Sequence, residues 1–147
     1  MTFLLDVNLL IALAWPTHVH HREAQEWFHR KGRRAWATCP LTQSGFIRIS
    51  SNPRFIDGAV TPREARRLLA QVTRADEHQF WPDDLDWADT IIPASLLVGH
   101  RQVTDAYLLG LALHRDGCLA TLDAGIESLL PPTSSARQHL EILARNP

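Results

Sequence analysis

Short apolar runs that alternate with segments of helical periodicity constrain the fold of this chain more than any other feature. Runs typical of buried strands cover residues 3–5, 35–39, 79–81, 118–122 and 140–143. Strands that alternate with helices favour a parallel sheet with helices on both faces. We therefore predict an α/β fold in which a parallel sheet of four to five short strands is flanked by helices.

Capping residues and helix breakers place the helices. The stretch Thr61-Pro62-Arg63-Glu64 combines a capping residue, a proline at the first helical position and a nearby acid, and it predicts a helix to about Arg74. Pro16 ends one helix and Asp116-Gly117 ends another. The remaining helices are expected over residues 9–15, 18–29, 42–49 and 106–114, with Thr42 capping the third and Thr104-Asp105 capping the last.

Length and composition favour a single cytoplasmic domain. A chain of 147 residues fits one domain, residues 1–147, and its 45% hydrophobic content supplies an ordinary core. No apolar run approaches the roughly eighteen residues of a membrane span, and the N-terminal segment lacks the basic start and cleavage site of a signal peptide. Cys39 and Cys118 form no C-x-x-C pair, which argues against a disulfide framework and a structural zinc site.

The formal net charge of −1 conceals an uneven distribution of charge along the chain. Residues 1–75 carry eleven Lys/Arg and five Asp/Glu, a balance of +6, whereas residues 76–147 carry four and eleven, a balance of −7. A basic half could meet a phosphate backbone while an acidic half holds cations. A solvated surface with uneven charge explains the same pattern equally well.

Three aspartates are expected at one edge of the predicted sheet. Asp6 and Asp123 each follow an apolar strand directly, and Asp105 lies in the first turn of a helix. In parallel α/β sheets the carboxyl ends of the strands meet the amino ends of the helices at the edge where ligands bind. An aspartate there often only caps backbone N–H groups, but clustered carboxylates repel one another unless a cation lies among them. The three acids therefore predict a site for a hard divalent ion, which can promote phosphodiester cleavage.

Three motifs in this order resemble those of PIN-domain nucleases. They are Leu4-Leu5-Asp6-Val7-Asn8, Val103-Thr104-Asp105-Ala106-Tyr107-Leu108 and Leu119-Ala120-Thr121-Leu122-Asp123. Their order and spacing, and the length of the chain, are similar to those of VapC-type toxins, and residues 39–48 resemble one branch of these toxins. The resemblance covers essentially the whole chain and implies the three-layer sandwich of a PIN domain.

The same resemblance implies a metal-dependent endoribonuclease that acts as the toxin of a toxin–antitoxin pair. Mg²⁺ or Mn²⁺ would be bound by Asp6, Asp105 and Asp123, which would also be catalytic, with Asn8, Thr104 and Thr121 in support. The implied partners are an RNA substrate, a cognate VapB-like antitoxin that blocks the acidic site, and a second copy of the chain in a homodimer. The alternative is a catalytically weak or inactive PIN-like domain that binds RNA or a protein partner.

Gln43 departs from the family pattern, because many PIN nucleases have a glutamate at this place. We expect Gln43 among the catalytic residues, since its amide oxygen can bind a metal or orient water without adding a negative charge. The departure leaves open whether one or two metals bind. Glu127 and Asp116 could substitute for the missing acid, although a surface or helix position suits both better.

Basic side chains are the candidates for RNA binding. Arg63, Arg66 and Arg67 share one helical face by their spacing of three and four residues, and Arg101 shortly precedes the central motif. Residues 30–34, Arg-Lys-Gly-Arg-Arg, form a second basic segment. These groups could guide RNA, and a solvated surface is about as good an explanation.

The remaining clusters of functional side chains favour structural roles. His18, His20 and His21 lack the i, i+4 spacing that places two metal ligands on one helical face, so an exposed helix start is expected. The aromatic residues in apolar-periodic segments are expected in the core rather than as platforms for bases. They are Trp15, Trp27, Phe28 and Trp36.

Two other classes of phosphate enzyme fit the sequence poorly. A phosphatase of the haloacid dehalogenase type needs an aspartate where Asn8 stands, and it needs a lysine, as a phospho-receiver domain does. The single lysine, Lys31, is far from the predicted strand ends. No G-x-x-x-x-G-K-[ST] motif occurs, which excludes a P-loop nucleotidase.

Overall fold

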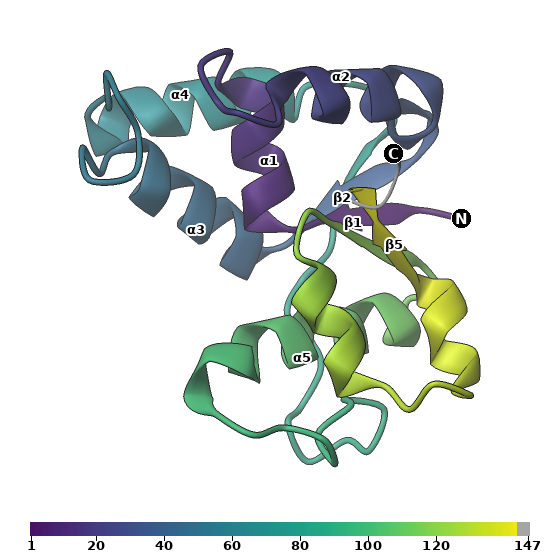
Figure 1. The fold of residues 1–147 in the computed structure, drawn as a ribbon. Coiled ribbons are helices and arrows are strands. Elements are labelled where there is room, and N and C mark those ends of the chain that lie inside the picture. The colour runs from purple at the N-terminus through teal and green to yellow at the C-terminus, as the bar shows by residue number, and fades with distance from the viewer. Residues whose placement is uncertain (144–147) are drawn as a thin grey trace.

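A computed structural model describes residues 1–143, and within them a five-stranded parallel sheet runs through the molecule (Figure 1). Its strands are β1 (Phe3–Leu5), β2 (Trp36–Thr38), β3 (His78–Phe80), β4 (Cys118–Thr121) and β5 (Leu140–Ile142), in the spatial order β3-β2-β1-β4-β5. The central strand β1 pairs through Leu4 with Ala37 on one side and with Leu119 on the other. The predicted α/β fold with a parallel sheet of short strands is confirmed.

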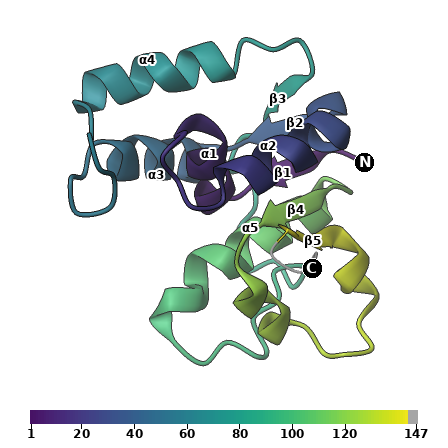
Figure 2. The same ribbon diagram turned by 45° about the horizontal axis from the view of Figure 1, so that its top comes forward.

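Helices cover both faces of this sheet (Figures 1 and 2). One face carries α1 (Val7–Ala14), α2 (His21–Arg30), α3 (Pro40–Ser50) and α4 (Pro62–Val72), with the short 3-10 helix η1 (Gly32–Arg34) before β2. The other face carries α5 (Val103–His114) with the 3-10 helices η2 (His100–Gln102), η3 (Ala124–Leu129) and η4 (Ser135–His139). The expected three-layer arrangement follows.

The two faces bury separate apolar clusters because successive strand residues point to opposite sides of a sheet. Phe3 and Leu5 of β1 pack with the helices of the α1 face, whereas Leu4 packs with α5 on the other face. Trp27 and Trp36 are buried in the first cluster, and Trp15 and Phe28 pack against it while partly buried, as expected for core aromatics. Both cysteines are buried and free.

Several helix starts differ from the sequence-based prediction, and capping explains the differences at α1 and α3. α1 begins at Val7 because the Asp6 side chain accepts its backbone N–H, which leaves no separate turn after β1. α3 begins at Pro40 rather than after Thr42, because proline suits the first helical position. The Thr42 hydroxyl instead accepts from the backbone N–H of Cys39 at 3.0 Å, from inside the first turn. α2 begins at His21, so His18 and His20 lie in the preceding turn.

α5 also begins earlier than predicted. It starts at Val103, directly after η2, and its N-cap residue is Gln102, so the prediction that Thr104 caps this helix is wrong. Residues 106–112 of α5 are all buried, which is why this helix shows little amphipathic pattern. Within residues 1–143, none of the helices combines the length and apolar character that a membrane-spanning helix requires.

Candidate functional site

Asp6 is buried where β1 ends and α1 begins. The residue is 6% exposed; its Oδ1 accepts the Val7 backbone N–H and its Oδ2 accepts the Thr121 hydroxyl, both at 2.7 Å. Burial raises the pKa of Asp6, the nearby charge of Asp123 raises it further, and the two hydrogen bonds oppose this rise. The carboxylate is therefore fixed in position at some electrostatic cost.

Thr121, the last residue of β4, organises the surroundings of Asp6. Besides donating to Asp6, its hydroxyl oxygen accepts from the side-chain amide of Asn8 at 3.2 Å and from the backbone N–H of Asp123 at 3.0 Å. The amide oxygen of Asn8 in turn accepts the backbone N–H of Leu122 at 3.2 Å. These bonds hold the carboxyl ends of β1 and β4 together.

Asp105 and Asp123 lie at the same edge of the sheet as Asp6. We call these three residues the acidic rim. Asp105 lies in the first turn of α5 and is half-buried, whereas Asp123 is exposed and caps η3 by accepting the Gly125 backbone N–H at 2.8 Å. Burial, together with the charges of Asp6 and Asp123, raises the pKa of Asp105 to about 7. The structure thus brings the three predicted acids within range of one another's charge.

A cavity of about 290 Å³ opens beside the acidic rim. Asp105 and Asp123 line it together with the cationic side chain of Arg101. The other lining residues are Gln102, Gly125, Ile126, Ser128 and Leu129. A space lined by two carboxylates and a guanidinium can hold a phosphate group together with a cation.

The acidic rim is suited to a hard divalent ion that keeps part of its water shell. Among residues 1–143, no three His, Cys, Asp or Glu side chains converge closely enough to enclose one ion by themselves. Mg²⁺ is nevertheless commonly held by one or two carboxylates, with water and substrate phosphate as its other ligands. Burial is the main cause of the raised pKa of Asp105, and the repulsion by Asp6 and Asp123 that adds to it is the kind that a cation relieves.

Two further predicted site residues lie apart from the rim contacts. The Thr104 side chain is exposed and makes no hydrogen bond within the described part of the chain. The Gln43 amide donates to the Thr38 hydroxyl at 3.0 Å, and Thr38 also bonds with Nε2 of His78 at 2.8 Å. Over residues 1–143, Gln43 therefore forms no hydrogen bond with the acidic rim, and its predicted catalytic role remains a prediction.

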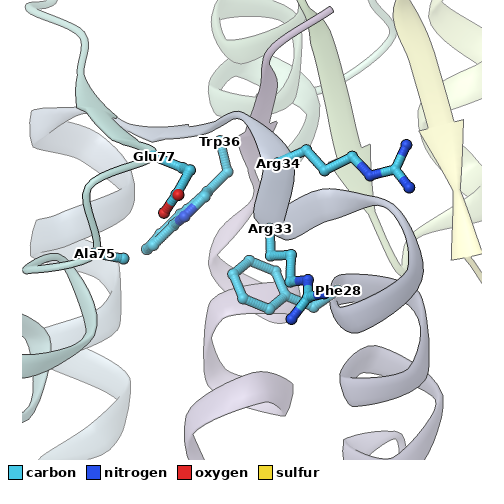
Figure 3. Close-up of a pocket in the computed structure, with 6 residues that line it drawn as sticks. All are labelled: Phe28, Arg33, Arg34, Trp36, Ala75 and Glu77. Carbon is cyan, nitrogen blue, oxygen red and sulfur yellow. The ribbon is translucent and has the colours of Figure 1, made fainter.

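The candidate basic residues lie in three different places. Arg101 lines the rim cavity, while Arg63, Arg66 and Arg67 are exposed on α4, which Figures 1 and 2 show on the far side of α3 and α1 from α5. Two residues of the basic segment 30–34 instead line a second cavity, at the amino ends of β2 and β3 (Figure 3).

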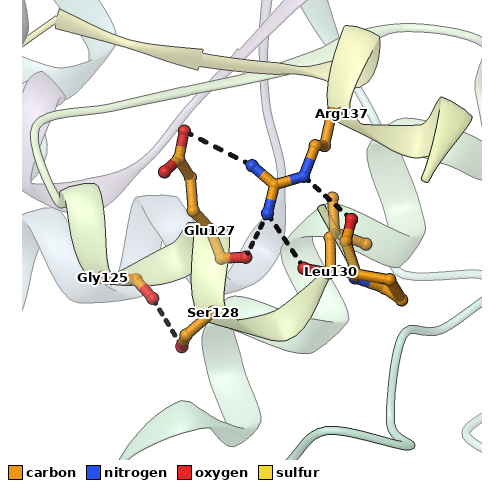
Figure 4. Close-up of polar contacts among 6 residues, drawn as sticks. Gly125, Glu127, Ser128, Leu130 and Arg137 are labelled. Atoms are coloured by element: carbon orange, nitrogen blue, oxygen red, sulfur yellow. Dashed lines mark hydrogen bonds and ion pairs between the residues drawn. The ribbon is translucent and has the colours of Figure 1, made fainter. Parts of the chain in front are cut away.

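The two acids considered as substitutes both lie away from the rim contacts. Glu127 pairs with Arg137 at 3.7 Å, and the Arg137 guanidinium also donates to the backbone carbonyls of Glu127, Leu130 and Pro131 (Figure 4). Asp116 is exposed in the turn between α5 and β4, at the opposite end of α5 from Asp105. These surface and structural positions agree with the expectation for both residues.

Sequence reasoning missed several residues around these sites. Gln102 and Ser128 line the rim cavity and share a hydrogen bond at 3.4 Å, and Arg137 holds the turn after η3. Their partners are distant in the sequence or lie in irregular segments, where no periodic pattern marks them. The position of Gln102 before a helix start was the only available signal.

Comparisons with known proteins agree with the fold and the motifs. Residues 3–129 match the family model of the PIN domain. The chain is 48% identical to "Ribonuclease VapC38" of Mycobacterium tuberculosis over 126 residues, which is 86% of this chain and 88% of that protein. It is 40% identical to "Ribonuclease VapC44" of the same species over 144 residues, which is 97% of this chain and all of that protein.

One solved structure shares the fold at low sequence identity. It is the crystal structure of VapBC2 from Rickettsia felis bound to a DNA fragment from its promoter. The match has a TM-score of 0.57 at 10% identity, and it covers 88% of this chain and 93% of that chain.

Proposed function

The chain belongs to the PIN-domain family and within it to the VapC-type proteins, and we propose that it is a metal-dependent endoribonuclease, the toxin of a toxin–antitoxin pair. The observation that carries this proposal is the acidic rim beside a cavity that also contains Arg101. The relatives named as ribonucleases, at 40% and 48% identity over most of the chain, support cleavage of RNA.

The residues at the rim and its cavity have different roles in the proposed phosphodiester hydrolysis. A divalent ion, Mg²⁺ or Mn²⁺, supplies activation of water and neutralisation of charge on the phosphate when bound. One or two of the rim carboxylates would hold it, and Asp6 is kept in place for this by Val7 and Thr121. Arg101, which lines the same cavity, would attract the phosphate. Gln43 adds no charge to the rim, which favours a single tightly held ion.

RNA approaches the rim from a surface that includes exposed arginines. Arg101 contacts RNA nearest the reaction, and Arg63, Arg66 and Arg67 of α4 attract the phosphate backbone from further away. The protein acts in the cytoplasm, where its substrate is found.

A cognate VapB-like antitoxin and a second copy of the chain are the proposed protein partners. An acidic rim next to an open cavity suits a basic antitoxin segment that blocks the carboxylates. The structure that shares the fold contains VapBC2, which supports a complex of this type. A homodimer would join two such surfaces into one groove for RNA.

Thermal melting with and without metal tests the proposed ion site. Mg²⁺ or Mn²⁺ should raise the melting temperature of the parent by mass action, and Asp105→Asn should lose most of that rise. Asp76→Asn is the matched control, because the Asp76 side chain is exposed and makes no hydrogen bond or ion pair within residues 1–143. The same metal response in parent and Asp105→Asn would contradict the site.

Expression in a bacterial host separates a toxin from an inactive PIN-like domain. The parent should stop growth, Asp105→Asn should not, and co-expression of the antitoxin encoded beside the gene should restore growth. Growth that is unaffected by the parent, or equally arrested by Asp105→Asn, would favour a domain that only binds RNA or protein.

A further inference from the structure

The second cavity lies at the amino edge of the sheet, away from the acidic rim (Figure 3). It has a volume of about 570 Å³ and is lined by Phe28 of α2, Arg33 and Arg34 of η1, Trp36 of β2, and Ala75 and Glu77 before β3. Apart from Phe28, the residues that line this cavity lie just before a strand or at its first residue, whereas Asp6 and Asp123 follow the strands β1 and β4. The two cavities therefore belong to opposite edges of the sheet.

The wall of this cavity contains a buried hydrogen-bond donor without an acceptor. Trp36 is 1% exposed, and within residues 1–143 its indole N–H has no hydrogen-bond partner. Buried donors in native proteins nearly always have a partner, because an unpaired one destabilises the fold. Glu77, an exposed residue, lines the same cavity as Trp36 (Figure 3). Because Trp36 is part of the cavity wall, its unpaired N–H is the donor that an acceptor on a ligand would satisfy.

The charged side chains of the cavity are also available for a ligand. In the described part of the chain, Arg33, Arg34 and Glu77 are exposed and none of the three forms an ion pair. Arg33 and Phe28 both line the cavity, whereas the Arg34 side chain extends away from the other lining side chains (Figure 3). The cavity thus offers a cation, an aromatic ring, a donor and an anionic acceptor.

These groups match the parts of a nucleotide. The volume falls within the roughly 300–1,000 Å³ of small-molecule sites. A guanidinium binds phosphate, aromatic side chains stack on bases, and a carboxylate accepts from an exocyclic amino group. We propose that this cavity binds a nucleotide with an amino-bearing base: its phosphate on Arg33, its base against Phe28, a ring acceptor at the Trp36 N–H and its amino group on Glu77.

The nucleotide has two sources with the same chemistry. It is either a free nucleotide or one nucleotide of an RNA chain whose scissile bond lies at the acidic rim. The second source rests on the proposed ribonuclease function, whereas the first is independent of it. An RNA chain bound at both the acidic rim and this cavity would gain stacking and ionic contacts at a distance from the cleaved bond.

The test follows the indole N–H signals of the protein in a proton–nitrogen correlation spectrum. The five tryptophans give one such signal each. The Trp36 signal is assigned with Trp36→Phe, or by through-bond experiments if that variant does not fold. AMP should shift this signal, and purine riboside 5′-monophosphate, which is AMP without its amino group, should bind about tenfold more weakly. Arg33→Ala should weaken AMP binding about tenfold. Glu77→Ala should remove the preference for AMP over purine riboside 5′-monophosphate, and Arg48→Ala, an exposed change on α3, should alter neither.

The same spectrum separates the two sources. With Asp105→Asn present to prevent cleavage, a short single-stranded RNA that shifts the Trp36 signal and displaces AMP identifies RNA as the source. RNA without effect on a signal that AMP shifts identifies the free nucleotide. Either result supports the nucleotide site.

Three outcomes would overturn the nucleotide site. They are a Trp36 signal that neither nucleotides nor RNA shift, a shift unchanged in both Arg33→Ala and Glu77→Ala, and a response to a protein partner alone. Cleavage that persists while AMP fails to bind would count against this site alone. AMP binding without any RNA cleavage would count against the proposed ribonuclease function alone.

Discussion

Replacing Asp105 with asparagine should stabilise the protein in metal-free solution above neutral pH. The variant keeps the shape of the side chain and removes its charge. The pKa of Asp105 is raised from 3.8 to about 7 by burial first and by the charges of Asp6 and Asp123 in addition. The folded state therefore binds a proton more tightly than the unfolded state, so stability is lost as pH rises from about 4 to about 7.

The size of the effect follows from this rise in pKa. Raising an acid from 3.8 to about 7 corresponds to about 4 kcal/mol at 1.36 kcal/mol per pH unit. Asp105 is only half-buried, and solvent screening reduces this to about 2 kcal/mol. For a chain of this length, that gain is worth roughly 6 °C in melting temperature.

Calorimetric melting in the presence of a chelator measures the difference between parent and Asp105→Asn. We expect Asp105→Asn to melt higher at pH 8 and at the same temperature as the parent near pH 4, with Asp76→Asn equal to the parent at both. A gain of the same size at pH 4 and pH 8 would refute the electrostatic reasoning. A variant no more stable than the parent at pH 8 would refute it as well.

Three further substitutions test other parts of the structure. Thr121→Val should lower the free energy of unfolding by about 2 kcal/mol, because the Asp6 carboxylate loses a hydroxyl donor; a urea midpoint equal to that of the parent would contradict the network. Arg137→Met should lower the free energy of unfolding by about 2 kcal/mol, because the backbone carbonyls after η3 lose their donor. Urea unfolding measures this change, and an unchanged midpoint would mean that water replaces the guanidinium. Gln43→Glu should bind Mn²⁺ more tightly in calorimetric titration, because it adds a negative charge near the strand ends, although it loses the amide that donates to Thr38. Equal affinities of parent and variant would place position 43 outside the metal site.

The sheet and the acidic rim could be predicted because their signals are local. Each strand is a short apolar run, and Asp6 and Asp123 directly follow two of these runs. The alternation of strands and helices then forces the carboxyl ends to one edge, so the meeting of the three acids needed no knowledge of distant contacts. The order of the strands in the sheet could not be read from the same pattern.

Contacts between distant segments account for what could not be predicted. The bond from Gln43 to Thr38 and the pairing of Glu127 with Arg137 depend on side-chain directions that spacing does not fix. The start of α5 was misplaced because η2 winds directly into it, and the side chain of its N-cap residue Gln102 forms no capping hydrogen bond with the helix. Likewise, the residues around Trp36 come from separate elements, and only the folded chain gathers them.

Cleavage of RNA by the purified protein is the most direct test of the proposed function. A labelled single-stranded RNA pool is incubated with equal amounts of parent, Asp105→Asn and Asp76→Asn, each with Mg²⁺ or Mn²⁺ and each with excess chelator. We expect metal-dependent cleavage by the parent and Asp76→Asn, and a loss of at least about a hundredfold in Asp105→Asn. Cleavage that survives in Asp105→Asn, or that proceeds unchanged with chelator, would contradict the acidic rim as the catalytic site.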